Sequence, residues 1–170
     1  AFAFGGGGLF GTYLGGFLAN RYAAGKETMQ LRAVALAHTL YGALYVMLYL
    51  SSNKYVALTF VAIIGIVITL SNGPVFSAIQ SLVNARIRSV ALALIFLLAN
   101  LIGFGLGPLA AGVLSDLLAP MFGSESLRYA LVLFSPGFLW VAYHYWKAGD
   151  TIEADIRRIE SSVALGEGGA

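Results

Sequence analysis

Five long stretches of this chain contain no Asp, Glu, Lys or Arg. A helix needs about 20 mainly apolar residues to cross a hydrocarbon core about 30 Å thick, and each stretch is close to that length or longer. Only helices and closed barrels satisfy their backbone groups in lipid, and the alternating pattern of a barrel is missing. We therefore expect an all-α membrane protein with five transmembrane helices, at about residues 1–20, 33–53, 55–83, 89–115 and 129–146.

The composition excludes several other classes of protein. Charged residues make up 11% of the 170 residues, against about 25% in a soluble domain. A net charge of +2, spread along the chain, argues against nucleic acid as a partner. The chain has no cysteine, which excludes disulfides and the usual thiolate zinc site. We expect no metal and no cofactor.

Basic residues gather in alternate connections between the expected spans. The second and fourth connections carry only Lys54 and Arg128. The first and third connections and the segment after the last span carry Arg21, Lys26, Arg32, Arg86, Arg88, Lys147, Arg157 and Arg158. Because Lys and Arg collect on the cytoplasmic side of a membrane, we expect the first span to start outside and the C-terminus to be cytoplasmic.

The residues after position 147 differ from the transmembrane region, 1–147. Asp150 and Glu153 resemble a capping box, and apolar residues follow at helical spacing. These are Ile152, Ile156, Ile159 and Val163. The pattern predicts that residues 148–170 form a cytoplasmic amphipathic tail, with a short helix on the inner membrane surface.

Small residues recur every four positions in the first and fourth expected spans. Such stripes let helix backbones approach closely in lipid, so we expect both helices to pack against a neighbour. The stripes are Gly7, Gly11 and Gly15, and then Ala99, Gly103, Gly107 (followed by Pro108), Ala111 and Ser115. The second span has a row of tyrosines instead, Tyr41, Tyr45 and Tyr49, and we expect it, with its His38, at the periphery.

The third expected span is long and contains the sequence Ser71-Asn72-Gly73-Pro74. Proline removes a backbone donor, so a kink here exposes carbonyl groups that need partners. Polar residues surround the kink, and they either satisfy these groups or line a substrate pathway. The candidates for that pathway are Thr69, Ser71, Asn72, Ser77 and Gln80 for a polar head, with Phe76 for an apolar tail.

Several segments resemble the major facilitator superfamily of transporters. Gly16, Asn20, Arg21 and Lys26 fit its loop motif G-x-x-x-D-R with trailing basic residues, except that Asn20 replaces the acidic residue. Residues 73–83 (GPVFSAIQSLV), 86–88 (RIR), 100–108 (NLIGFGLGP) and 112–116 (GVLSD) resemble its spinster-like branch. This resemblance adds Asn100 to the pathway candidates.

The resemblance implies more than the spans do. The five spans would be helices 8 to 12 of a twelve-helix fold. The chain would pack against the missing N-terminal half of the same transporter. The function would be secondary transport of a small amphipathic lipid, such as a lysophospholipid, by alternating access. In bacterial members a proton gradient drives this transport, and the location would be the bacterial inner membrane, among its lipids.

Other functions stay open at this stage. The chain could belong to a transporter of a sugar or organic anion, or serve as a membrane scaffold that does not transport. An enzyme is not expected, because paired carboxylates, a histidine cluster or an activated serine are missing. We expect Asp116 and Arg128 to form an ion pair that stabilises the last connection, with contact to a substrate headgroup at the outer mouth as the alternative.

Overall fold

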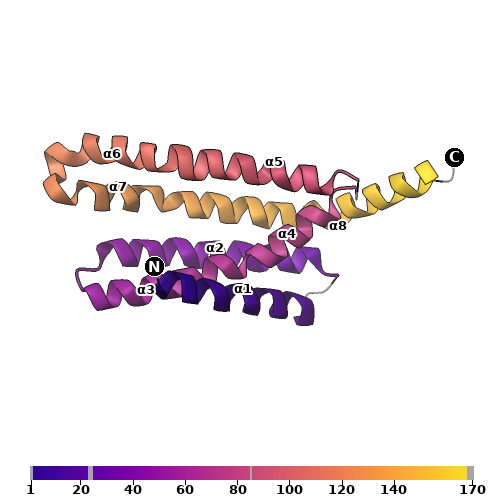
Figure 1. Cartoon of the computed structure of the whole chain (residues 1–170), viewed down its shortest axis with the longest axis horizontal. Coiled ribbons are helices and arrows are strands. Elements are labelled where there is room, and N and C mark those ends of the chain that lie inside the picture. The colour runs from indigo at the N-terminus through magenta and orange to yellow at the C-terminus, as the bar shows by residue number, and fades with distance from the viewer. Residues whose placement is uncertain (1, 23–24, 85, 168–170) are drawn as a thin grey trace.

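The computed structural model describes residues 2–22, 25–84 and 86–167, with the side chains of these residues except 2–4, 19, 20, 22 and 162–167. Every element in this described part is a helix, as expected from the sequence. Figure 1 shows helical rods that lie side by side, most of them roughly along the long axis of the molecule.

Four helices form the N-terminal part of the molecule: α1 (Phe2–Tyr22), α2 (Glu27–Leu50), α3 (Lys54–Leu70) and α4 (Asn72–Ser81). Gly25 precedes α2 with a φ of 69°, a left-handed conformation that glycine adopts without a steric penalty. The side chain of Asn53 accepts a hydrogen bond of 2.9 Å from the backbone N–H of Tyr55 and so caps α3. The α2–α3 turn is therefore short and locally stabilised.

The remaining helices form a long hairpin, which we call the C-terminal hairpin. Its first arm is α5 (Arg88–Asn100), the π-helical segment η1 (Leu101–Leu106) and α6 (Gly107–Phe122). The chain turns through the short 3-10 helix η2 (Gly123–Glu125) and returns in α7 (Ser126–Phe134) and α8 (Pro136–Glu167). The hydroxyl oxygens of Ser115 and Ser126 lie 3.0 Å apart and join the two arms next to the turn.

Within the described residues, three helical stretches are long and apolar enough to cross a membrane. They are residues 27–50, 54–81 and 88–161, the last of 74 residues. The chain therefore suits a membrane, but the expectation of five separate spans is wrong. The 74-residue stretch folds back on itself at η2, so residues 89–115 and 129–146 lie in the two separate arms of the C-terminal hairpin. The expected span at residues 1–20 is the one not found, since the glycine-rich α1 is not among the three stretches.

Helix α2 lies at the centre of the described helices and not at the periphery, as its tyrosine row had led us to expect. It contacts α3, α4, α7 and α8. The Tyr41 side chain is 6% exposed and packs with Leu44 and Ile64 in one core cluster. Its ring meets that of Phe138 edge to face, at 4.5 Å between centroids. Interlocking aromatic rings thus provide the close packing that small residues provide elsewhere.

Helix α1 packs on α3 through its glycines. A Cβ atom added at Gly7 would lie 2.7 Å from the carbonyl oxygen of Ala62. Added Cβ atoms at Gly11 and Gly15 would overlap the carbonyl oxygens of Ile66 and Leu70. Three glycines spaced by four residues therefore face three carbonyl groups with the same spacing, and we call this contact the glycine–carbonyl ladder.

The second small-residue stripe packs only at one end. A Cβ atom added at Gly103 would meet no atom within 4 Å, and one added at Gly107 would meet only the Ile102 carbonyl, at 4.0 Å. Ala111 is half-buried and Ser115 bonds to Ser126. The expected packing of Gly103, Gly107 and Pro108 against a neighbour is therefore wrong for the described part of the chain, since the arms of the hairpin meet closer to the turn.

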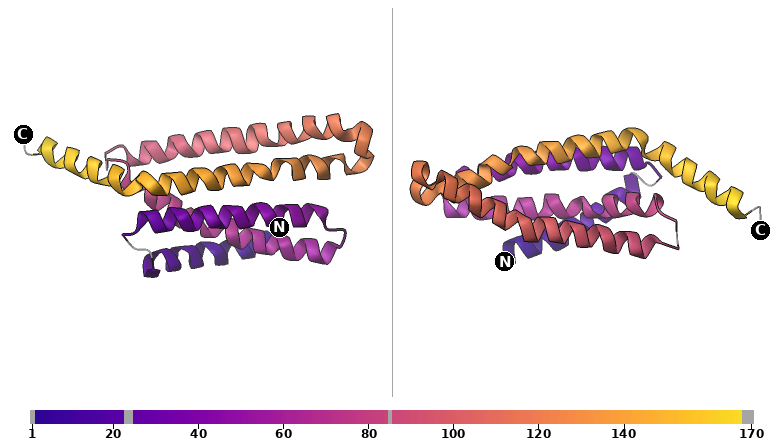
Figure 2. Two further views of the ribbon diagram at one scale, coloured as in Figure 1. Left: turned by 180° about the vertical axis from the view of Figure 1, so that it is seen from behind. Right: turned by 90° about the horizontal axis from the view of Figure 1, so that it is seen from above.

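The tail is not a separate helix. Residues 148–167 continue α8, which extends beyond the other helices near the C-terminus (Figure 2). Ile152 is 3% exposed and packs with Leu31 of α2 and Ala78 of α4. The expected helix start at Asp150 is thus wrong, because Ile152 and the half-buried Ile156 attach this part of α8 to the bundle. The side chain of Val163 lies outside the described residues.

A Gly11→Ala substitution tests the glycine–carbonyl ladder. The new methyl group would overlap the backbone of Ile66, so we expect the free energy of unfolding to fall by about 1–3 kcal/mol. The measurement is the midpoint of thermal unfolding of the detergent-solubilised protein. The matched control is Gly6→Ala in the same helix, where an added Cβ meets no atom within 4 Å. Equal midpoints for the two variants would contradict the ladder.

Candidate functional site

The break between α3 and α4 lies where the sequence predicts a kink. Ser71 joins the two helices with a helical φ and ψ of −76° and −20°, so the rod bends without unwinding. Pro74 has no N–H to donate to the carbonyl of Leu70, and this carbonyl faces Gly15. The Ser71 side chain is 3% exposed, and its hydroxyl has no hydrogen-bond partner.

Three of the predicted pathway residues share one face of α4. Asn72, Phe76 and Gln80 are spaced by four residues, which places them on one side of a helix. The ring of Phe76 lies 5.2 Å from that of Phe96, so this face is turned toward α5. We call the facing sides of α4 and α5 the polar face.

Asn100 belongs to the same polar face, from the α5 side. It follows Phe96 by one turn, and its amide nitrogen donates a hydrogen bond of 2.6 Å to the Phe96 carbonyl. Asn72 precedes Phe76 by one turn on α4, which runs the opposite way (Figure 1). The two asparagines therefore lie on the same side of the phenylalanine contact. Both side chains are exposed in the structure.

The other predicted pathway residues lie elsewhere. Thr69 donates a hydrogen bond of 2.7 Å to the carbonyl of Gly65 in its own helix and touches the glycine–carbonyl ladder at Gly11. Ser77 is exposed on α4, one position after Phe76. The structure thus places Asn72 and Asn100 on one side of the Phe76–Phe96 contact and Gln80 on the other side of it along α4, and it leaves Thr69 and the buried Ser71 in packing positions.

The loop motif occupies the end of α1 and the start of α2. Gly16 lies beside the kink, because a Cβ added at Gly73 would be 3.7 Å from the Gly16 backbone nitrogen. Arg21 and Lys26 are exposed, and Lys26 precedes the first residue of α2. The side chain of Asn20 lies outside the described residues.

Charged and aromatic side chains join the start of α2 to α8 at the same end of the molecule. The guanidinium of Arg32 donates to the carboxylate of Asp150 at 3.2 Å and lies over the ring of Trp146, 5.2 Å from its centroid. Lys147 Nζ reaches the second carboxylate oxygen of Asp150 at 3.6 Å. We call these contacts the α2–α8 clamp.

A pocket of about 470 Å³ lies at the opposite end, between the two short turns. Arg128 and Glu125 form an ion pair of 2.6 Å at this pocket, with 39% and 49% of their side chains exposed. The expected pair of Arg128 with Asp116 is therefore wrong, because Glu125 is only three residues away on the same turn. We call this cavity the turn-end pocket. It is lined by Leu48, Tyr49, Ser51, Ala57, Ser124, Glu125, Leu127, Arg128 and Leu131.

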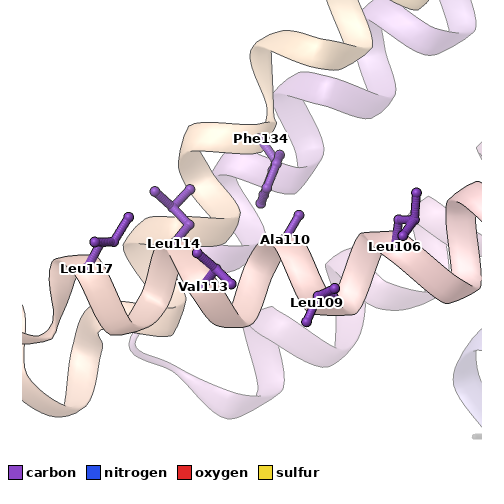
Figure 3. A pocket seen from close by; sticks show the side chains of 7 residues that line it. All are labelled: Leu106, Leu109, Ala110, Val113, Leu114, Leu117 and Phe134. Carbon is purple, nitrogen blue, oxygen red and sulfur yellow. The ribbon is translucent and has the colours of Figure 1, made fainter.

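Two apolar cavities continue from the turn-end pocket toward the middle of the hairpin. The middle pocket, of about 240 Å³, lies between α2 and the two hairpin arms and is lined by Tyr45, Tyr49, Gly107, Ala110, Ala111, Leu131, Phe134 and Phe138. The α6 groove, of about 490 Å³, is lined only by apolar side chains. Figure 3 shows Phe134 pointing toward the α6 side chains across this groove.

None of these three cavities is lined by a residue that the sequence singles out for the pathway. The tyrosine row predicts that Tyr45 and Tyr49 lie at the periphery, whereas both line the middle pocket. Glu125 stands three residues before Arg128, a spacing that suits an ion pair on a helix, and this signal could have identified the turn-end pocket. No group of three His, Asp or Glu residues in the described part could hold a metal ion.

No family model matches the chain, and no curated protein or solved structure matches it.

An Asp150→Asn substitution tests the α2–α8 clamp. The clamp side chains are partly exposed, so we expect the free energy of unfolding to fall by about 1 kcal/mol or less at low salt. Screening should remove the difference at about 1 M salt. Thermal unfolding at the two salt concentrations measures this, with Glu153→Gln one turn later on α8 as the matched control. A salt-independent loss would show that the Asp150 carboxylate acts through something other than charge.

Proposed function

We propose that the chain is the C-terminal part of a secondary transporter that resembles the spinster-like branch of the major facilitator superfamily. Its substrate is a small amphipathic lipid, of which lysophospholipids are the model. Transport proceeds by alternating access, with this part rocking against an N-terminal half around a site at mid-membrane. A proton gradient is the proposed driving force, and the bacterial inner membrane the proposed location.

The polar face carries this proposal. Asn72, Gln80 and Asn100 lie on helical stretches that suit a membrane, and the side chains of Asn72 and Asn100 are exposed while that of Gln80 is half-buried. Polar groups are costly in contact with lipid tails, so such a face is expected where it lines a water-filled path. The adjoining Phe76 and Phe96 supply an apolar surface for a lipid tail.

The arrangement of charges supports the proposed orientation. The α1–α2 and α4–α5 connections and the tail all lie at one end of the molecule (Figure 1), and they carry eight of the ten basic residues. Lys54 and Arg128 lie at the other end. The positive-inside rule then places the C-terminus in the cytoplasm and the turn-end pocket outside.

A scaffold is the second candidate, since α5, η1 and α6 have no buried residue and could bind other membrane helices. A transporter of sugars or organic anions is the third. Both candidates predict a result different from the lipid transporter in the experiments below.

Replacing Asn72 and Gln80 by leucine tests the polar face. We expect uptake of a labelled lysophospholipid by cells that express the complete gene product to fall about tenfold or more, since each amide bond to a substrate is worth about 1 kcal/mol. Thr59→Val is the matched control, because the hydroxyl of this exposed α3 residue is already bonded to the carbonyl of Tyr55. Unchanged uptake at equal membrane yield would remove both residues from the site.

Single cysteines provide a test that needs no substrate, because the chain has none of its own. We expect Asn72→Cys and Asn100→Cys to react with a charged, membrane-impermeant thiol reagent, since a transport path admits water. Leu94→Cys, an exposed residue of α5 away from Phe96, should stay unreacted in lipid. A scaffold whose polar face is closed by another helix would leave all three cysteines unreacted.

A further inference from the structure

We propose that the turn-end pocket, the middle pocket and the α6 groove form one binding groove for a zwitterionic phospholipid of the surrounding bilayer. The headgroup lies at the Glu125–Arg128 pair, and one acyl chain follows the groove along α6. This groove is separate from the polar face of α4 and α5. The inference uses the membrane location of the proposed function but does not require transport.

Shared lining residues connect the three cavities. Tyr49 and Leu131 line both the turn-end pocket and the middle pocket. Ala110 and Phe134 line both the middle pocket and the α6 groove. The three cavities therefore adjoin one another, with the polar lining in the turn-end pocket and the apolar lining in the other two, and the α6 groove runs along residues 106–117. A phospholipid has the same two kinds of group, a polar headgroup and apolar chains.

The charges at the polar end favour a zwitterion. Glu125 and Arg128 are opposite in sign and only 2.6 Å apart, and each keeps further hydrogen-bonding capacity, since a guanidinium has five N–H donors and a carboxylate two oxygens. Arg128 can bind a phosphate, while Glu125 and the ring of Tyr49 can bind an ammonium group. An anionic headgroup without an ammonium group would offer nothing to the carboxylate of Glu125 and would add a negative charge beside it.

The rest of the groove fits an acyl chain. Ala110, Ala111 and Gly107 form one wall of the middle pocket, and their small side chains keep it open against the rings of Tyr45 and Phe138. The α6 groove lies on an arm of the hairpin with no buried residue, so it is open to the bilayer. A lipid can enter it sideways and leave its second chain among its neighbours, which favours a two-chain bilayer lipid over a single-chain substrate.

Photocrosslinking in vesicles tests the groove. The complete protein is reconstituted with phosphatidylcholine that carries a diazirine in one acyl chain, and the labelled peptides are identified by mass spectrometry. We expect labelling to concentrate on peptides containing Tyr45, Leu131 and Phe134. Labelling spread evenly over α5 residues that face lipid, such as Leu94, would overturn the inference.

Two substitutions address the apolar and polar ends separately. Ala111→Leu fills the middle pocket and should reduce the specific labelling about tenfold, whereas Gly112→Leu, where an added Cβ meets no atom within 4 Å, should leave it unchanged. Arg128→Gln should reduce the specific labelling by the phosphatidylcholine probe about tenfold, the worth of one charge-assisted hydrogen bond. Unchanged labelling in either Ala111→Leu or Arg128→Gln would overturn the proposal.

Competition distinguishes the possible ligands. Phosphatidylcholine should compete better than phosphatidylglycerol and better than lysophosphatidylcholine. Equal competition by the anionic lipid overturns the headgroup assignment, and equal competition by the lysolipid overturns the assignment to a two-chain lipid. Transport is measured on the same vesicles. Specific labelling without transport would contradict the proposed function alone, and transport without specific labelling would contradict the groove alone.

Discussion

The packing of α2 against both α3 and α8 holds the described helices together. Tyr41 lies between Ile64 of α3 and Phe138 of α8. Gly42 lets the backbone of α8 approach, since a Cβ there would lie 3.0 Å from that of Phe138. The C-terminal hairpin is attached to the N-terminal helices mainly through α2, so this aromatic contact helps to fix the position of the polar face and of the middle pocket, which Tyr45 and Phe138 line.

The features that the sequence predicted well depend on few residues. The helical class follows from apolar stretches whose backbone groups must be satisfied internally. The break after α3 follows from Pro74, which has no N–H to donate to the carbonyl four residues earlier. The central place of α2 could not be predicted, because it depends on which distant helix meets the tyrosine row. Likewise, the two small-residue stripes have the same spacing, yet only the one containing Gly11 meets a neighbour along its length.

The candidate site was predicted only in part, for a related reason. The spacing by four residues alone assigns Asn72, Phe76 and Gln80 to one face. It does not tell that this face turns toward Phe96 and Asn100, because that depends on the path of the chain from α4 to α5. The middle pocket and the α6 groove combine residues from α2, η1, α6, α7 and α8, and no local pattern marks them. The described part of the hairpin is long and apolar enough to cross a membrane.

The glycine–carbonyl ladder has a mechanical consequence. Because Gly7, Gly11 and Gly15 each face one carbonyl group of α3, a slide of α1 by less than one turn, about 5.4 Å, would bring side-chain atoms against the α3 backbone. Contacts of this kind allow discrete steps and resist small ones. The ladder therefore favours movement of α1 and α3 as one unit. Pro74 leaves the Leu70 carbonyl without its helical donor, so the bend at Ser71 is the place in this rod where a change of angle breaks no further backbone bond to that carbonyl.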